Sequence, residues 1–176
     1  EDHLAALTAE ERHWPESTRR ISQLRLTLDY TPQGFIARNF GRDRLHIDIV
    51  DYPGEWLLDL PLLGLSFQEW SAETVAASRL PPRLALASDW HGMLTALAPA
   101  KPADERQAVK AAELFTSYLA RCRGNDVSLS SLPPGRFLMP GDLAGSPLLT
   151  FAPLDVTPDA AFPRGSLGAL MARRYD

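Results

Sequence analysis

Apolar and polar residues alternate along two segments in the first third of the chain. In QLRLTLDY, residues 23–30, every second position is apolar, and the alternation returns in LHIDIVD, residues 45–51. A period of two is typical of a half-buried β-strand. Because TPQG and GRDR are turn sequences, with a plausible short strand in FIARNF between them, we predict an antiparallel ribbon over about residues 23–51. One face would carry Leu24, Leu26, Leu28, Tyr30, Leu45, Ile47 and Ile49.

After Trp56 the pattern changes from a strand period to a helical one. LLDLPLLGL, residues 57–65, is predicted as a loop because Pro61 and Gly64 interrupt it. Ser66 and Glu69 have the spacing of a capping box, which predicts the start of a helix. The predicted helices cover about residues 3–14, 66–79, 83–97, 103–123 and 166–175.

The helix predicted over residues 103–123 has one continuous apolar stripe. It includes Cys122, for which we therefore predict core packing rather than reactivity. Trp56, Trp70 and Trp90 are interpreted as core aromatics first and as a partner surface second. The stripe is Ala108, Ala112, Phe115, Leu119 and Cys122.

Residues 125–165 are rich in proline and glycine. A segment this irregular is unusual in a free-standing domain, so we expect it to pack against a surface outside the chain. Residues 148–151, LLTF, form a candidate short strand. Helical patterns are interrupted at both ends of the sequence, and we expect a fragment of a longer protein.

Composition limits the classes of function. The 176 residues suit one ordinary domain, and 45% of them are hydrophobic. A formal charge of -4 argues against general binding to nucleic acid or anionic membrane. The apolar runs are too short for a transmembrane segment and no signal peptide is evident, so a cytoplasmic location is expected. A single cysteine and four scattered histidines, His3, His13, His46 and His91, give no internal disulfide or zinc pattern.

The candidate chemistry centres on Asp51, which ends the second predicted strand. D-x-x-G after an apolar strand is the pattern with which GTPase-type folds bind magnesium through the acid and the γ-phosphate through the glycine amide. The chain matches it at Asp51–Gly54, Asp89–Gly92 and Asp142–Gly145, but only Asp51 follows a predicted strand. The alternative is that DYPG is only a turn with an aspartate cap.

Residues upstream of the ribbon fit the same plan. In GTPase-like folds, a loop with a magnesium-binding threonine or serine precedes the strand that pairs with the D-x-x-G strand, and Ser17 and Thr18 occupy that place here. Arg19, Arg20, Arg42 and Arg44 lie near the predicted ribbon ends, where a solvated face is the ordinary interpretation and a phosphate contact the alternative.

Three long segments carry a resemblance to a known family. DYPGEWLLDLPLLGLSFQEW, HLAALTAEERHWPESTRRISQLRLTLDY and GRFLMPGDLAG resemble the YcjX-like family of bacterial stress-associated P-loop NTPases. The resemblance implies an α/β fold: part of a P-loop, GTPase-like domain with an antiparallel ribbon and a mainly helical insertion. Residues 1–56 would belong to the nucleotide-binding domain, 57–124 to the insertion, and 125–176 to a return segment that starts a core helix.

The resemblance also implies a site that binds Mg²⁺ and GTP or ATP. Asp51 and Thr18 would hold the metal, Gly54, Ser17 and Thr18 would contact the nucleotide, and Glu55 would stand where GTPases usually have a water-orienting glutamine. The only lysines are Lys101 and Lys110, so G-x-x-x-x-G-K-[ST] is absent. We therefore expect this chain alone to be inactive and to bind nucleotide weakly.

Two hypotheses about function follow. In the first, the intact protein is a GTP- or ATP-hydrolysing switch, in which this segment supplies the D-x-x-G turn and a helical lid. Its partners would be the remainder of its own nucleotide-binding domain and a possible protein partner, without nucleic acid. In the second, the segment is a non-catalytic scaffold or partner-binding module with a vestigial D-x-x-G turn.

Overall fold

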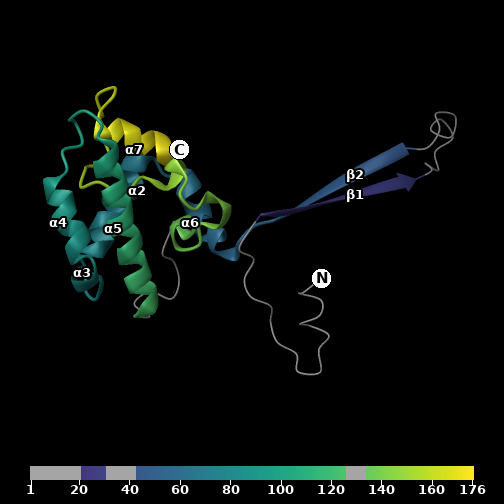
Figure 1. Cartoon of the computed structure of the whole chain (residues 1–176), viewed down its shortest axis with the longest axis horizontal. Coiled ribbons are helices and arrows are strands. Elements are labelled where there is room, and N and C mark those ends of the chain that lie inside the picture. The colour runs from purple at the N-terminus through teal and green to yellow at the C-terminus, as the bar shows by residue number, and fades with distance from the viewer. Residues whose placement is uncertain (1–20, 31–42, 126–133) are drawn as a thin grey trace. The chain divides into compact units, whose positions relative to one another are not determined.

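The computed structural model describes residues 21–30, 43–125 and 134–176, shown in colour in Figure 1. It divides into two compact units, Glu1–Gly54 and Glu55–Asp176. The predicted helix over 3–14 and the predicted strand in FIARNF lie outside the described residues. The described parts combine helices with one small antiparallel sheet of two strands. The assignment of residues 1–56, 57–124 and 125–176 to parts of a nucleotide-binding domain stays a prediction.

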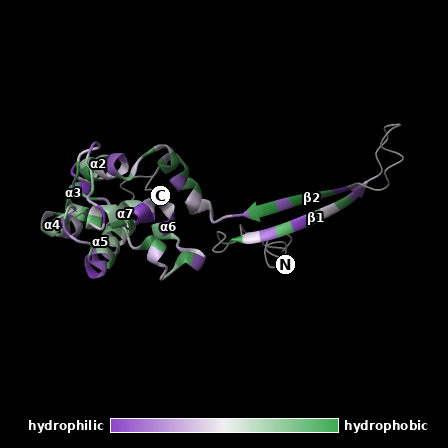
Figure 2. Ribbon diagram, turned by 90° about the horizontal axis from the view of Figure 1, so that it is seen from above, coloured by the Kyte–Doolittle hydropathy of each residue, from purple (hydrophilic) through white to green (hydrophobic). Residues whose placement is uncertain are grey.

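The first unit contains the predicted ribbon. Strands β1, Ser22–Tyr30, and β2, Asp43–Asp51, pair antiparallel. The register is the one that the alternation requires, because apolar residues face apolar residues across the strands. Bands of hydrophobic colour alternate with polar ones along both strands in Figure 2. The pairs are Leu24 with Ile49, Leu26 with Ile47, and Leu28 with Leu45.

The polar face of the ribbon is joined by cross-strand side-chain contacts. Arg25 donates two hydrogen bonds to the Asp48 carboxylate, from Nε to Oδ1 at 2.6 Å and from Nη2 to Oδ2 at 2.9 Å. Arg44 Nε donates to Asp29 Oδ1 at 2.9 Å. The guanidinium of Arg25 holds the pKa of Asp48 below its usual value. These contacts reinforce the register that the apolar pairs set.

The predicted loop after Trp56 is wrong, because the segment is helical. A 3-10 helix, η2, spans Gly54–Gly64 and contains Pro61. Pro61 and Gly64, on which the loop prediction was based, both lie within this helix. A 3-10 helix has three residues per turn, so its contacts recur at every third position, and the sequence carries that spacing.

Helix α2, Phe67–Ser78, begins at the predicted capping box. The Glu69 carboxylate accepts from the Ser66 backbone N–H at 2.8 Å, and the Glu69 N–H donates to the Ser66 hydroxyl at 3.3 Å. Arg79 is its C-cap, so the predicted helix over 66–79 is confirmed. Reciprocal bonding satisfies amides that have no partner inside the helix.

The helix predicted over 83–97 is divided in two. Helix α3, Arg83–Leu86, and helix α4, Ser88–Ala96, are separated by Ala87. The backbone of Ala87 has φ -91° and ψ -2°, and its N–H is shared between the carbonyls of Arg83 and Leu84. Ala87 is fully buried, and it interrupts the helix where the pattern alone predicts a continuous one.

Helix α5, Glu105–Gly124, is the longest element and confirms the predicted third helix. The Asp104 side chain caps it by accepting from the Arg106 N–H at 2.9 Å. Every residue of the predicted stripe is buried, including Cys122. Cys122 is therefore a core residue, as predicted.

The described part of the irregular segment packs within the second unit, which corrects the expectation of an outside surface. The segment contains three short helices: α6, Gly135–Leu138, η3, Gly141–Leu143, and η4, Pro147–Leu149. The candidate strand in LLTF is wrong, since η4 occupies its first two residues and Thr150 and Phe151 belong to no strand. Phe137, Phe151 and Leu154 are buried in the same core as α5. The predicted last helix is α7, Leu167–Tyr175, capped by Ser166.

Aromatic rings dominate the core of the second unit. Trp70 stacks on Tyr175 with ring centroids 4.9 Å apart, and Trp90 stacks on Tyr118 at 5.1 Å. Phe115, from the middle of α5, contacts both tryptophans. The predicted core role of Trp70 and Trp90 is thereby confirmed. This core joins α2, α4, α5 and α7, which are grouped in the helical unit in Figure 1.

Candidate functional site

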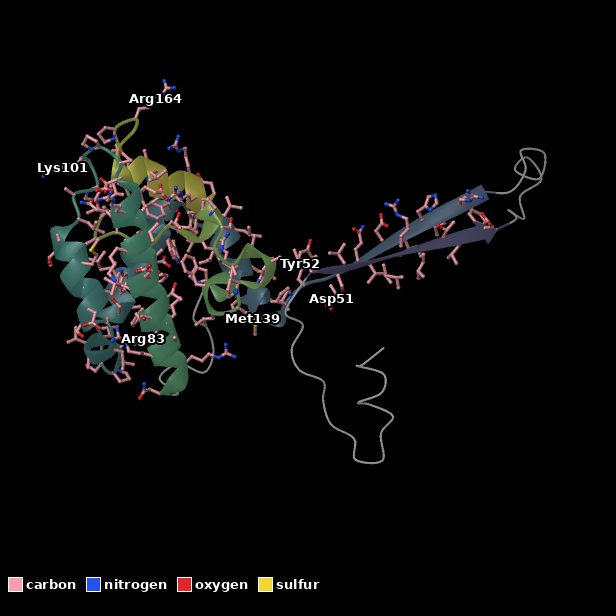
Figure 3. The ribbon with its side chains drawn as sticks, in the orientation of Figure 1. Asp51, Tyr52, Arg83, Lys101, Met139 and Arg164 are labelled. Atoms are coloured by element: carbon pink, nitrogen blue, oxygen red, sulfur yellow. The ribbon has the colours of Figure 1, made fainter. Side chains whose placement is uncertain are left out.

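Asp51 stands where the sequence places it, at the last position of β2. Its pairing partner across the ribbon is Ser22, the first residue of β1. The Asp51 side chain is exposed, and Figure 3 shows it with Tyr52 at the end of the strand. A strand end fixes the backbone while leaving the carboxylate accessible. This is the position at which α/β folds commonly place ligand-binding residues.

Gly54 follows Asp51 by three positions and begins η2. It is exposed, and a Cβ built on it would have no described atom within 4 Å. Its φ also lies outside the left-handed region that favours glycine. Within the described parts of the chain, neither backbone conformation nor packing requires glycine here. The first amides of η2 have no acceptor inside the helix, which suits them to an anion.

The other predicted site residues are only partly visible. Glu55 belongs to η2 by its backbone, while its side chain is outside the description. Ser17 and Thr18 lie outside the described residues. The structure therefore brings together Asp51 and Gly54 on one short turn, and the roles of Glu55, Ser17 and Thr18 stay predictions.

The donor set at this turn fits magnesium better than zinc. Among the residues that the structure describes, no three histidine, cysteine, aspartate or glutamate side chains gather as a metal site. Mg²⁺ is usually held by one or two carboxylates together with waters and phosphate oxygens. Asp51 supplies one such carboxylate, which is compatible with an ion shared with a nucleotide.

The two other D-x-x-G matches lie in different surroundings. Asp89 is in the first turn of α4, and its carboxylate accepts from Arg121 Nη1 at 2.8 Å. Gly92 lies within the same helix. Asp142 is in η3, within the proline- and glycine-rich segment. Of the three D-x-x-G aspartates, only Asp51 ends a paired strand, as the sequence predicted.

The helix that follows the turn is anchored through one side. Trp56 Nε1 donates to the Met139 carbonyl at 2.8 Å. Asp59 accepts from the Gly135 N–H, and Arg136 Nε lies 3.2 Å from its other carboxylate oxygen. These residues are far apart in sequence, so the prediction from local patterns missed Asp59 and Arg136. The only sequence signal was the three-residue spacing of Trp56, Asp59 and Leu62.

Burial dominates the electrostatics of Asp59. Loss of hydration raises the pKa of its carboxyl group, and this outweighs the Gly135 N–H and the Arg136 charge, which both favour the ionised form. The Arg136 guanidinium also lies over the Phe151 ring, 5.4 Å from its centroid. Asp59 is therefore a partly buried acid that ties η2 to α6.

Tyr175 completes this anchoring from α7. Its hydroxyl oxygen lies 2.9 Å from the Leu62 carbonyl oxygen and 3.1 Å from that of Leu65, so its one hydrogen is shared between these two acceptors. Burial raises the pKa of Tyr175 to about 12, which keeps the phenol protonated as a donor. Beside these contacts is a pocket of about 360 Å³. It is lined by Trp56, Asp59, Leu62, Leu63, Leu65, Arg136, Leu143, Tyr175 and Asp176.

Comparison with known proteins gives a consistent result. The model of the YcjX-like family matches residues 1–176. The chain is 38% identical over 154 residues to the Ras-like GTPase YcjX of Escherichia coli (strain K12), which covers 87% of this chain and 32% of the relative. It is 40% identical over 158 residues to the Ras-like GTPase YcjX of Shewanella oneidensis (strain MR-1), with 86% and 31% covered.

The chain thus spans about a third of the length of these curated relatives. Among the described residues, no helix combines the length and apolar character that a membrane crossing requires. The family match extends over the ribbon, the D-x-x-G turn and the helical unit alike. The chain belongs to the YcjX-like family.

Proposed function

We propose that this chain is the switch segment of a cytoplasmic P-loop protein that binds and hydrolyses GTP or ATP and is linked to a stress response. The observation that carries the proposal is the turn itself: Asp51 ends a paired strand, and Gly54 begins a helix three residues later. The relatives named Ras-like GTPase support GTP as the nucleotide. The link to stress rests on the family resemblance alone.

Each residue of the turn has a defined role in this proposal. The Asp51 carboxylate holds Mg²⁺, together with Thr18. The Gly54 amide donates to the terminal phosphate, and Glu55 orients or deprotonates the attacking water. When bound, the ion would neutralise charge on the phosphate oxygens. A carboxylate at position 55 also repels the phosphate, which predicts slow turnover.

The isolated chain should bind nucleotide weakly. The backbone amides and lysine of a phosphate loop normally supply most contacts to the β-phosphate, and that motif is absent from these 176 residues. Titration of labelled GTP and ATP with Mg²⁺ into the chain tests this. Micromolar binding would contradict it and would point to a phosphate site of another kind.

The decisive test uses the full-length protein and two substitutions in the turn. Asp51→Ala should weaken Mg²⁺-dependent binding or hydrolysis, and Gly54→Ala should weaken triphosphate binding more than diphosphate binding. Because a Cβ at Gly54 meets no described atom, Gly54→Ala should fold normally. Unchanged binding and hydrolysis in a folded Asp51→Ala protein would leave the scaffold hypothesis.

A matched control is available in the second D-x-x-G sequence. Gly92 is exposed, and a Cβ there also meets no described atom within 4 Å. Since it lies inside α4, Gly92→Ala should add about 0.5–1 kcal/mol of helix stability and leave nucleotide binding unchanged. A similar loss of triphosphate binding in both variants would contradict a special role for Gly54.

Glu55→Gln separates two roles of the carboxylate. Loss of hydrolysis with binding intact would identify Glu55 as a base. Faster hydrolysis would identify relief of repulsion between the carboxylate and the phosphate. Binding of both nucleotides serves as the control in either case, because it reports whether the turn itself is intact.

The lid role of the helices is tested by hydrogen exchange of the full-length protein. η2 begins at Gly54, the last residue of the D-x-x-G turn, and is hydrogen-bonded to α6, the Met139 backbone and α7. We therefore expect a movement of the turn to change hydrogen exchange in η2 and in the helix that follows it. Protection across residues 52–80 should differ between GDP and a GTP analogue. Identical protection would contradict the lid role while leaving nucleotide binding untouched.

A further inference from the structure

The 3-10 geometry of η2 sorts its side chains into separate ridges. With three residues per turn, positions three apart lie above one another. Trp56, Asp59 and Leu62 form the inner ridge, whose contacts with Met139, Gly135 and Tyr175 are described above. We call Leu57, Leu60 and Leu63 the outer ridge. Their side chains are 61%, 58% and 85% exposed.

The outer ridge is held in a fixed orientation. The bonds of the inner ridge involve side chains and carbonyls at both ends of η2, so rotation of the helix would break several of them together. Leu62, between Leu60 and Leu63 in sequence, is buried. Because these hydrogen bonds hold η2 in place, Leu57, Leu60 and Leu63 stay exposed on the surface of the folded helical unit.

A pocket with a mixed lining adjoins the outer ridge at Leu63. Leu63 lines the pocket of about 360 Å³ together with Leu62, Leu65 and Leu143. Asp59, Arg136 and Asp176 supply charge in the pocket lining. A row of exposed leucines beside a pocket lined by leucines and a few charged groups suits a binding segment whose own side chains are mainly apolar.

We propose that the outer ridge and this pocket are the docking surface for the part of the full-length protein that lies outside residues 1–176. Curated relatives extend over about three times the length of this chain, so an occupant from the same polypeptide is available. Chain that continued past Asp176 would also start at this surface, because Tyr175 and Asp176 line the pocket beside Leu63.

The size of the surface favours an occupant from the same chain. Burying one leucine removes on the order of 100 Å² of apolar surface, so the ridge offers roughly 300 Å². A stable complex between separate molecules buries about 800 Å² on each partner. A contact within one chain avoids most of the entropy lost when two molecules associate, so a small ridge suffices.

Site-specific photo-crosslinking in the full-length protein tests the occupant. Benzoylphenylalanine is placed at Leu60 or Leu63, and at Leu84 as a control, which is 50% exposed on α3 and does not line the pocket. Positions 60 and 63 should give crosslinks within one chain to peptides outside residues 1–176, at least about fivefold above position 84. Crosslinks to a second copy, to another protein, or to residues 1–54 would overturn the proposal.

A second measurement covers the case in which no crosslink forms. Leu60→Ser and Leu63→Ser should lower the melting temperature of the full-length protein by several degrees more than Leu84→Ser, because only the ridge would be buried there. Equal shifts in the three variants would overturn the proposal. Both experiments are performed without nucleotide, so their outcome is independent of whether the D-x-x-G turn binds one.

Discussion

The ribbon and the helical unit contain similar apolar residues, yet only the helical unit encloses them. Trp90 and Phe115 are fully buried, whereas Ile47 on the ribbon is 38% exposed and Leu24 is 55% exposed. The difference is one of layers, because β1 and β2 are the only described elements of their unit and one pair of strands does not enclose a core by itself. Such a ribbon is marginally stable by itself, while the helical unit has a core of its own.

The largest effect should appear in hydrogen exchange of the 176-residue chain. Amides near Phe115 in α5 should exchange through global unfolding, whereas amides in β1 and β2 should exchange through local opening. We expect at least about 100-fold less protection in the ribbon, or about 2.7 kcal/mol in opening free energy. Ribbon protection equal to that of α5 would mean that the ribbon is stabilised within this chain.

Core truncation gives the next largest effect. Phe115 contacts Trp70, Trp90 and Phe137 with ring centroids 5.9, 5.0 and 5.8 Å away. Phe115→Ala should lower the unfolding free energy of the helical unit by about 3–5 kcal/mol in urea denaturation. Leu84→Ala, at an exposed position, is the control and should cost far less. Comparable losses would contradict the location of the core.

The elements that follow local rules were the ones that the sequence predicted. Alternation in the two strands is enough to set the register of Leu26 with Ile47, since a slip by one residue would place apolar side chains opposite polar ones. The capping box of Ser66 and Glu69 and the stripe of α5 depend on residues a few positions apart. For the same reason, the position of Asp51 at a strand end was predictable.

What the sequence did not predict depends on distant contacts. Asp59 and Gly135 are 76 positions apart, and no local pattern joins them. Phe137 and Phe151 are likewise buried in the core that α5 helps to form. Because the local sequence does not show this distant contact, the proline- and glycine-rich segment was expected to pack on a surface outside the chain. η2 was missed because a 3-10 helix has a weaker signature than an α-helix. The position of Asp51 at a strand end is thus predictable, whereas the contacts that η2 makes within the helical unit are not.

A smaller effect is expected from the pH dependence of the helical unit. Burial raises the pKa of Asp59 above its ordinary value of 3.8, so the native state binds this proton more tightly than the unfolded state does. The resulting stability is fully present below the unfolded pKa and is lost as pH rises through the raised pKa. Relative to Asp59→Asn, the wild type should therefore lose stability as pH rises through the raised pKa of Asp59.

Denaturation in urea at several acidic pH values measures that difference. A difference in unfolding free energy between the two proteins that stays flat, or that grows with pH in favour of the wild type, would contradict the dominance of burial over the Arg136 charge. The Gly135 N–H retains an acceptor in Asp59→Asn, since the asparagine carbonyl oxygen can replace a carboxylate oxygen.

The smallest effect concerns the Arg25–Asp48 pair on the ribbon. The two side chains are 61% and 39% exposed, so their contact should add little to stability despite its paired geometry. It still has a local signature, because hydrogen bonding from Arg25 lowers the pKa of Asp48. Any stability from that shift exists above the unfolded pKa and is lost as pH falls through the lowered one.

An NMR titration of the Asp48 carboxyl, in wild type and in Arg25→Ala, detects this shift where denaturation cannot. The pKa of Asp48 should be lower in the wild type than in Arg25→Ala, because the variant lacks the guanidinium that stabilises the ionised carboxylate. The measurement also sharpens the comparison of the two units, because the shift requires the ribbon to be paired. If Asp48 titrates identically in both proteins within the 176-residue chain, but differently in the full-length protein, the ribbon pairs only in the full-length protein.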